Sequence, residues 1–197
     1  MPATASPDIA YIEEISPGSG RRVAPRAHLD SDSPVLDLCG DWRFRLYPSA
    51  GEADAAASDP GFDDSGWDAI DVPSHWVLRG DGRWGRPAYT NVKYPFPLDP
   101  PHVPDANPTG DHRRRFGLPP DWLAGGRVWL RFDGLESLGR VWLNGHEVGV
   151  VRGSRLRQEL DVTDRVRAGG NVLVVRVHQW SAMSYVEDQD QWWLPGI

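Results

Sequence analysis

An Asn-Gly pair between two apolar segments constrains the fold of this chain more than any other feature. Residues 141–143 (Val-Trp-Leu) precede Asn144-Gly145, and residues 146–150 (His-Glu-Val-Gly-Val) follow it. Both central residues of a two-residue hairpin turn need a positive φ, which asparagine and glycine adopt at low cost. The sequence therefore predicts an antiparallel β-hairpin with its turn at Asn144 and Gly145.

Several other segments alternate between apolar and polar residues, as a strand with one buried face does. Within residues 41–47, Trp42, Phe44 and Leu46 fall on one face, and mostly charged residues fall on the other. Shorter candidate strands lie at residues 67–73, 128–132 and 157–162.

Residues 171–179 are apolar on both faces, which predicts a central strand between two layers. We expect no helix longer than about two turns, with short helical turns near residues 53–58 and 163–167.

The turn-forming residues divide these strands into many short pieces. The chain contains 21 glycines and 18 prolines among its 197 residues. Short strands with frequent turns predict an all-β fold, namely an antiparallel β-sandwich and most simply a jelly roll. We expect an extended or poorly ordered arm over residues 1–34 and the sandwich domain over residues 35–197.

Charge and cysteine content exclude some classes of partner. The formal net charge is −7 and the isoelectric point is about 5.3, which argues against nucleic acid and anionic membrane surfaces. No apolar segment approaches the ~20 residues that span a bilayer, and the N-terminus lacks a signal peptide. Cys39 is the single cysteine, which fits a reducing, cytoplasmic compartment. We expect its side chain to be a small buried filler.

Three other features have structural rather than catalytic interpretations. The triplet Arg113-Arg114-Arg115 is typical of a solvated strand or loop face, more than of a phosphate site. Residues 80–85 fit the pattern G-x-G-x-x-G, but Arg86-Pro87 follows and no helix can begin there, so we expect a plain turn. The six histidines lack zinc-site spacing.

The segment from residue 73 to residue 110 has almost no regular pattern. It contains eight prolines, together with aromatic residues such as Trp76, Tyr89 and Phe96. Aromatic residues argue against disorder in such a long segment, so we expect an ordered, proline-stiffened loop that packs on something.

Carboxylates and tryptophans lie together near the C-terminus, in Glu187-Asp188-Gln189-Asp190 followed by Gln191-Trp192-Trp193. Indole rings stack on sugar rings and carboxylates accept hydrogen bonds from sugar hydroxyls, so this segment is a candidate sugar site. A hard cation is also compatible with such oxygens. A solvated acidic loop beside core tryptophans is equally compatible, and a catalytic carboxylate pair is less favoured.

Several motifs resemble those of glycoside hydrolase family 2 β-galactosidases over residues 35–197. Two are specific: the loop that starts with Tyr89-Thr90-Asn91-Val92-Lys93-Tyr94-Pro95, and the segment 184–192 (Ser-Tyr-Val-Glu-Asp-Gln-Asp-Gln-Trp). The wider family also shares Phe132-Asp133-Gly134 and Trp142-Leu143-Asn144-Gly145.

The resemblance implies a galactose-binding-like jelly-roll domain that contributes two residues to the active site of a separate barrel. By motif these are Asn91 and Asp190, both contacting hydroxyls of the β-galactoside substrate. Asp190 would also help to hold a sodium ion. The other sodium ligands, the magnesium site and both catalytic glutamates would lie in the barrel.

The implied parent enzyme is a homo-oligomeric hydrolase of carbohydrate metabolism, of which this chain is an N-terminal fragment that is inactive alone. In the family another strand of the sandwich follows the segment that ends here, so we expect the sandwich to lack its last strand or more. The alternatives are a stand-alone carbohydrate-binding module and a subunit that complements a separate barrel-bearing chain.

Overall fold

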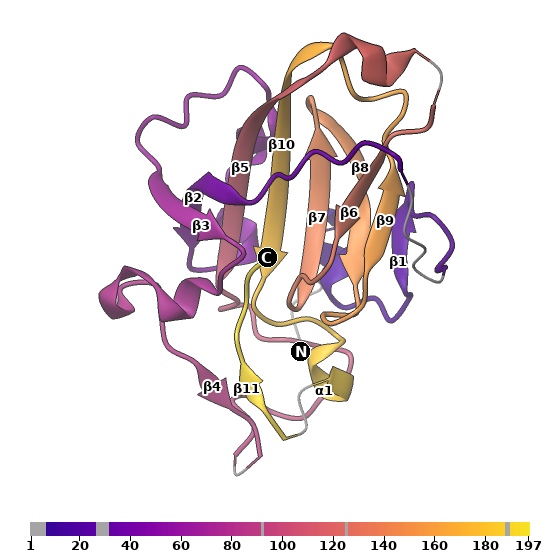
Figure 1. Cartoon of the computed structure of the whole chain (residues 1–197). Coiled ribbons are helices and arrows are strands. Elements are labelled where there is room, and N and C mark those ends of the chain that lie inside the picture. The colour runs from indigo at the N-terminus through magenta and orange to yellow at the C-terminus, as the bar shows by residue number, and fades with distance from the viewer. Residues whose placement is uncertain (1–6, 27–31, 92, 125, 188–189) are drawn as a thin grey trace.

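The main sheet brings together strands from both ends of the sequence. The computed structural model describes residues 7–26, 32–91, 93–124, 126–187 and 190–197. Seven antiparallel strands form this sheet in the order β1-β8-β7-β10-β5-β2-β3 (Figure 1). Their bounds are β1 Gly18–Gly20, β2 Gly40–Tyr47, β3 Asp68–Val72, β5 Thr109–Leu118, β7 Leu138–Leu143, β8 His146–Arg152 and β10 Gly169–His178.

The remaining elements are short. Two further antiparallel pairs are β6 (Trp129–Phe132) with β9 (Gln158–Asp161) and β4 (Ala88–Tyr89) with β11 (Trp192–Trp193). The α-helix α1 covers Ser184–Glu187; the 3-10 helices are η1 Pro7–Ile12, η2 Ala50–Glu52, η3 Ala55–Ser58, η4 Trp76–Leu78, η5 Gly80–Gly82 and η6 Pro120–Leu123. None of the helices in these described parts is long and apolar enough to cross a membrane.

The predicted hairpin is confirmed. Strands β7 and β8 pair in antiparallel register on either side of Asn144 and Gly145, which have φ angles of 54° and 83°. The Asn144 side chain is buried and donates to Arg165 O, while its oxygen accepts from Val172 N. Asn144 therefore both makes the turn and ties the hairpin to β10.

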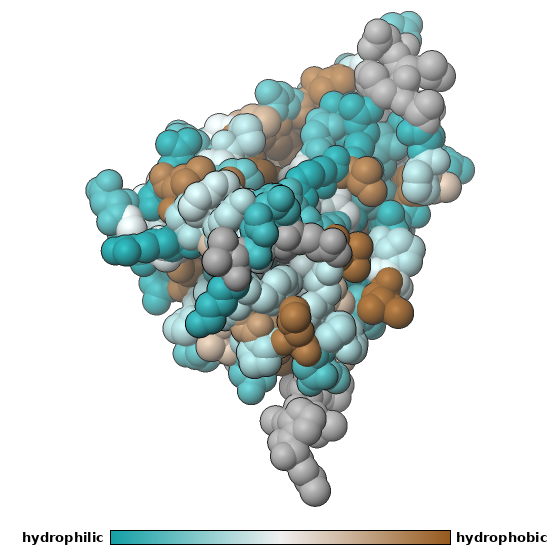
Figure 2. Space-filling model, turned by 90° about the horizontal axis from the view of Figure 1, so that it is seen from below, coloured by the Kyte–Doolittle hydropathy of each residue, from teal (hydrophilic) through white to brown (hydrophobic). Residues whose placement is uncertain are grey.

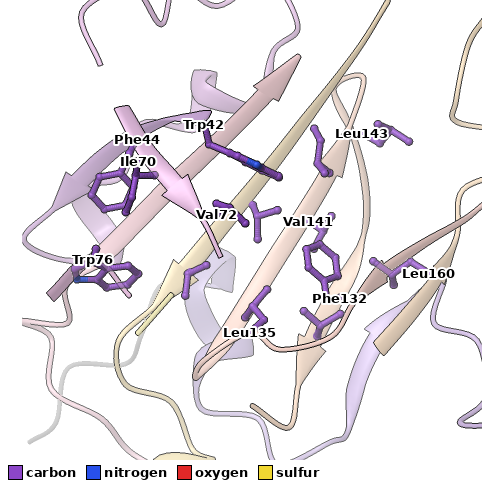
Figure 3. Close-up of a cluster of buried hydrophobic side chains, with 14 of the residues drawn as sticks. Trp42, Phe44, Ile70, Val72, Trp76, Phe132, Leu135, Val141, Leu143 and Leu160 are labelled. Atoms are coloured by element: carbon purple, nitrogen blue, oxygen red, sulfur yellow. The ribbon is translucent and has the colours of Figure 1, made fainter. Parts of the chain in front are cut away.

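A second layer covers one face of the main sheet, as expected for a β-sandwich. It consists of β6 and β9 and of two segments that meet at Gly196, which bridges to His75 and to Glu136. The core between the layers includes Trp42, Phe44, Ile70, Val72, Trp76, Phe132, Leu135, Val141, Leu143 and Leu160 (Figure 3). Close packing needs Gly110, because a Cβ atom there would lie 2.7 Å from Phe44 and 3.1 Å from Trp76.

Strand β5 was not predicted from the sequence, and it contains the arginine triplet. The interpretation of the triplet as a solvated face is wrong for Arg113, which is 1% exposed. Its guanidinium donates to Asp64 at 2.7 Å, to Ala57 O at 2.9 Å and to Pro60 O at 3.1 Å. Arg113 therefore holds the segment after β2 against the outer face of the sheet.

A second buried ion pair lies on the same outer face. Arg176 of β10 donates two hydrogen bonds to Asp111 of β5, at 2.7 and 2.8 Å, and one to Asp54 O at 2.7 Å. Asp111 is fully buried, and this burial raises the pKa of its carboxyl group while Arg176 opposes the shift. The two central strands thus have polar partners on one face and the apolar core on the other.

The N-terminal segment is attached to both layers. Strand β1 pairs with β8 of the main sheet, and Val23 N donates to Glu159 O of β9 at 2.8 Å. The buried Arg152 donates to Ser16 O at 3.0 Å and to Tyr11 O. The sequence predicted an arm over residues 1–34. Its boundary stays a prediction, and residues 7–23 follow the surface of the sandwich.

Three smaller expectations have different outcomes. Residues 163–167 form a hydrogen-bonded turn rather than a short helix, with Val166 N donating to Val162 O. Cys39 is exposed rather than buried, and it lies just before the start of β2, which pairs between β5 and β3. Residues 80–85 form a turn that begins in η5, as expected, and Trp84 from this turn packs edge-on against Phe44 at 4.8 Å.

We predict that Arg113→Met lowers the free energy of unfolding by about 3 kcal/mol, because it removes the buried donor that Asp64 and Ala57 O share. Urea denaturation measures the change. Arg115→Met is the matched control, since the Arg115 side chain is 55% exposed, and it should change stability little. Equal losses in the two variants would contradict the role of Arg113.

Two buried histidines predict a pH dependence of stability. Burial lowers the pKa of His112 to about 4, and burial together with Arg176 and Arg140 lowers that of His178 to about 3. Both are neutral in the folded state at pH 5.5, whereas unfolding lets them bind protons below their ordinary pKa of about 6.5. The neutral histidines contribute their full stabilisation above pH 6.5. This contribution is lost as the pH falls from 6.5 towards the pKa in the folded state, which is about 4 for His112 and about 3 for His178.

Lowering the pH from 7.5 to 5.5 should therefore reduce the free energy of unfolding by about 3 kcal/mol, or about 1.4 kcal/mol for each histidine. Denaturation curves at the two pH values measure the difference. His178→Gln should halve it, and a stability that does not change with pH would contradict the assignment.

Candidate functional site

A two-stranded ribbon brings the two predicted sugar-contacting residues together. Strands β4 and β11 project from one end of the main sheet, beside α1 (Figure 1). Tyr89 pairs with Trp192 in this ribbon, and Thr90 N donates to Gln191 O at 3.4 Å. Asn91 follows β4 and Asp190 precedes β11, so backbone pairing places them at the same end of the ribbon.

Tyr89 connects these two residues through its hydroxyl group. The hydroxyl donates to Asp190 Oδ1 at 2.9 Å and accepts from Asn91 Nδ2 at 3.4 Å. Asn91, Tyr89 and Asp190 are all exposed. The structure thus assembles an accessible amide, hydroxyl and carboxylate from segments 101 residues apart.

The two faces of the ribbon differ. On the inner face Trp193 is fully buried, stacks on Trp180 with ring centroids 5.7 Å apart, and donates its indole N–H to Gln179 O. On the outer face Tyr89 and Trp192 are 42% and 57% exposed, with ring centroids 5.1 Å apart. Exposed aromatic rings beside a carboxylate are suited to stacking on a pyranose ring.

Glu187 has a structural partner, although it belongs to the same acidic segment. Its carboxylate accepts from Ser154 Oγ at 2.5 Å and from Ser154 N at 3.3 and 3.4 Å. This contact fastens α1 to the residues after β8. Residues 188 and 189 lie outside the described residues, so Asp190 is the acidic residue of this segment that faces solvent in the part described.

Glu136 and His75 lie where the last residues meet the second layer. Glu136 accepts from Leu194 N at 3.2 Å, and its burial raises the pKa of its carboxyl group. Burial also lowers the pKa of His75. Together with the Gly196 bridges, these contacts hold the segment after β11 against the sandwich.

The proline-rich loop is ordered, as predicted, and it packs within the chain. Tyr94 stacks on Tyr185 with ring centroids 5.7 Å apart, and Phe96 packs edge-on against Trp180 at 5.2 Å. Glu13 of the N-terminal segment accepts from Val103 N at 3.0 Å. The loop is therefore held by the N-terminal segment and by residues of the segment that follows β10.

The metal expectation concerns Asp190 alone in this chain. A carboxylate oxygen is a suitable ligand for a hard cation such as sodium. The described residues contain no group of three or more histidine, cysteine, aspartate or glutamate side chains placed to hold a metal ion.

Tyr89 was not predicted as a site residue, whereas Trp192 belongs to the segment that the sequence marked as a candidate sugar site. The two rings share a face because of the pairing register of β4 with β11, which no local pattern predicts.

Comparison with known proteins identifies the class to which this fold and site belong. Residues 35–197 match the family described as glycosyl hydrolases family 2, sugar binding domain. The chain therefore belongs to glycoside hydrolase family 2 and contains its sugar-binding domain, which confirms the resemblance.

Several similar relatives are β-galactosidases. The chain is 58% identical over 202 residues to that of Arthrobacter sp. (strain B7), covering 95% of this chain and 20% of the relative. It is 44% identical over 176 residues to that of Vibrio cholerae serotype O1, covering 89% and 17%. The chain thus spans about a fifth of the length of these relatives.

A solved structure supports the fold. The β-glucuronidase of Bifidobacterium dentium, complexed with coumarin-3-O-glucuronide, matches with a TM-score of 0.57 and 28% identity, covering 77% of this chain and 21% of that one.

We predict that Ser154→Ala raises the rate of amide hydrogen exchange in α1, because Glu187 loses the hydroxyl donor at 2.5 Å. Hydrogen exchange followed by mass spectrometry measures the change. Glu147→Gln, which weakens an exposed ion pair with Arg140 on the main sheet, is the control and should leave α1 unaffected. Unchanged exchange in Ser154→Ala would show that other contacts hold the helix.

Proposed function

We propose that this chain is the sugar-binding part of a β-galactosidase, an enzyme that hydrolyses terminal non-reducing β-D-galactose residues in β-galactosides. The observation that carries the proposal is the exposed cluster of Asn91, Tyr89 and Asp190 at the end of the ribbon. The 58% identity to the Arthrobacter β-galactosidase supports galactose as the sugar.

In this proposal the side chains of Asn91 and Asp190 bind galactose hydroxyls and orient the ring. Hydrolysis with retention needs two further carboxyl groups on either side of the glycosidic bond, and we assign these to glutamates of a barrel domain outside this chain. Glu187 is bound to Ser154, and Glu136 is buried against Leu194. The chain alone is therefore expected to be inactive.

The end of the molecule with the ribbon is the proposed contact with the barrel. Figure 2 views the molecule from this end and shows apolar side chains between polar ones. Val186 of α1 is 67% exposed, and Trp192 of β11 is 57% exposed. Apolar residues this exposed around a polar site are suited to an interface with another domain.

The ions of the parent enzyme are also a proposal. When bound, sodium would neutralise charge and orient a sugar hydroxyl, and Asp190 would supply one of its oxygen ligands. The remaining sodium ligands and the magnesium site would come from the barrel. We further propose that the parent enzyme is cytoplasmic, since the exposed single thiol of Cys39 fits a reducing compartment. We also propose that the parent enzyme is a homo-oligomer.

A second candidate function is a stand-alone carbohydrate-binding module. The exposed rings of Tyr89 and Trp192 beside Asp190 favour it, because stacking needs no second domain. Calorimetric titration of the chain with galactose and lactose separates the two: binding tighter than about 1 mM supports the module, because half a site should bind more weakly.

A chimera tests the proposed function directly. The chain should replace the matching N-terminal fifth of the Arthrobacter β-galactosidase and retain hydrolysis of an aryl β-galactoside. Asp190→Ala and Asn91→Ala should each lower kcat/KM by about tenfold or more, because each removes a hydrogen bond to the sugar. Asp68→Ala, which removes an exposed carboxylate on β3, is the control. A folded chimera that is inactive, or is indifferent to both changes, would refute the proposal.

A further inference from the structure

The hydroxyl group of Tyr89 lies between the two side chains that the proposed function assigns to galactose. It donates to Asp190 Oδ1 at 2.9 Å and accepts from Asn91 Nδ2 at 3.4 Å. A single group therefore fixes the spacing of an amide and a carboxylate that come from segments far apart in the sequence.

The position of this hydroxyl is set independently of the sugar. Backbone pairing places Tyr89 opposite Trp192, and the two rings contact each other with centroids 5.1 Å apart at 39°. The inner face of the ribbon is anchored by the fully buried Trp193. Because the strands fix the backbone and Trp192 restrains the ring, Tyr89 presents its oxygen at a defined place.

The two hydrogen bonds also determine which atoms remain for a ligand. The Nδ2 group of Asn91 donates one of its two N–H bonds to Tyr89, so the second N–H and the carbonyl oxygen of the same amide remain for a ligand. Asp190 uses Oδ1 for Tyr89, so Oδ2 remains, and it only accepts. The pair therefore offers two acceptor oxygens, to which sugar hydroxyls can donate, beside one remaining amide donor.

We propose that Tyr89 is a positioning residue that orients Asn91 and Asp190 as a fixed pair of hydrogen-bond acceptors for two sugar hydroxyls. The inference rests on the proposed function and deepens it, since it specifies the direction of each hydrogen bond to the sugar. Tyr89 acts through its two neighbours.

The first test is Tyr89→Phe in the chimera, which removes the hydroxyl and retains the ring against Trp192. We expect kcat/KM to fall about tenfold, mainly through a higher KM, because both acceptors lose their common support. The melting temperature should not change. Tyr47→Phe removes a hydroxyl from β2 in the main sheet and should leave kcat/KM unchanged. Full activity of Tyr89→Phe would overturn the inference.

A double-mutant cycle separates positioning from a general effect on the fold. In the Asp190→Ala background, Tyr89→Phe should cost much less than tenfold, because one of the groups that Tyr89 orients is absent. An activated aryl β-galactoside is the substrate for these assays, so that the low kcat/KM of the Asp190→Ala variants can be measured. An equal loss in both backgrounds would show that Tyr89 acts on the structure in general and would overturn the proposed role.

Modified sugars test whether the sugar hydroxyls donate to Asn91 and Asp190, as proposed. Inhibition constants of non-hydrolysed thiogalactosides should rise similarly when a contacting hydroxyl is replaced by hydrogen or by fluorine, since fluorine cannot donate to an acceptor. Fluorinated analogues that bind as well as the parent sugar would overturn the acceptor assignment. If Asn91→Ala and Asp190→Ala impair the chimera but Tyr89→Phe does not, only this inference fails and the proposed function stands.

Discussion

The pairing of β5 with β10 is the constraint on which the rest of the molecule depends. Ten residue pairs join these strands, and every other strand of the main sheet is added outward from them. At one end of this ladder Asn107 donates to Trp180 O and accepts from Trp180 N, both within 2.9 Å. Trp180 then stacks on Trp193 of the ribbon. The buried side chains of Asn107 and Trp180 therefore connect the centre of the sheet to the ribbon that contains the candidate sugar site.

Buried polar groups give this central ladder its specificity. His178 at the end of β10 forms hydrogen bonds with the hydroxyl of Tyr11 at 2.6 Å and with Thr109 Oγ1 at 2.9 Å. Arg113 and the pair of Asp111 with Arg176 satisfy charges that would otherwise be costly to bury. Tyr11 of η1 and Asp64 of the segment after β2 supply partners from outside the main sheet, so the sheet depends on segments that are not among its strands.

The sequence predicted those parts of the fold whose information is local. The Asn144-Gly145 turn, the alternation in β2 and the apolar β10 each depend on neighbouring residues, and the structure agrees with all three. Strand β5 was missed because the partners of its charged residues, such as Asp64, lie far away in sequence. Asn91 and Asp190 were found by family resemblance, and the hydroxyl that joins them became visible only in the register of β4 and β11.

The N-terminal segment has a consequence for how the domain can be trimmed or fused. Arg21 N donates to Val148 O of β8, while Arg21 O accepts from Asp161 N of β9, so one residue closes the gap between the two layers. Deleting residues up to 23 would leave two neighbouring strand edges with unpaired amide and carbonyl groups, which are templates for association between molecules. A tag attached ahead of residue 7 would leave these strand edges covered, whereas a shortened N-terminus would expose them to pairing with another molecule.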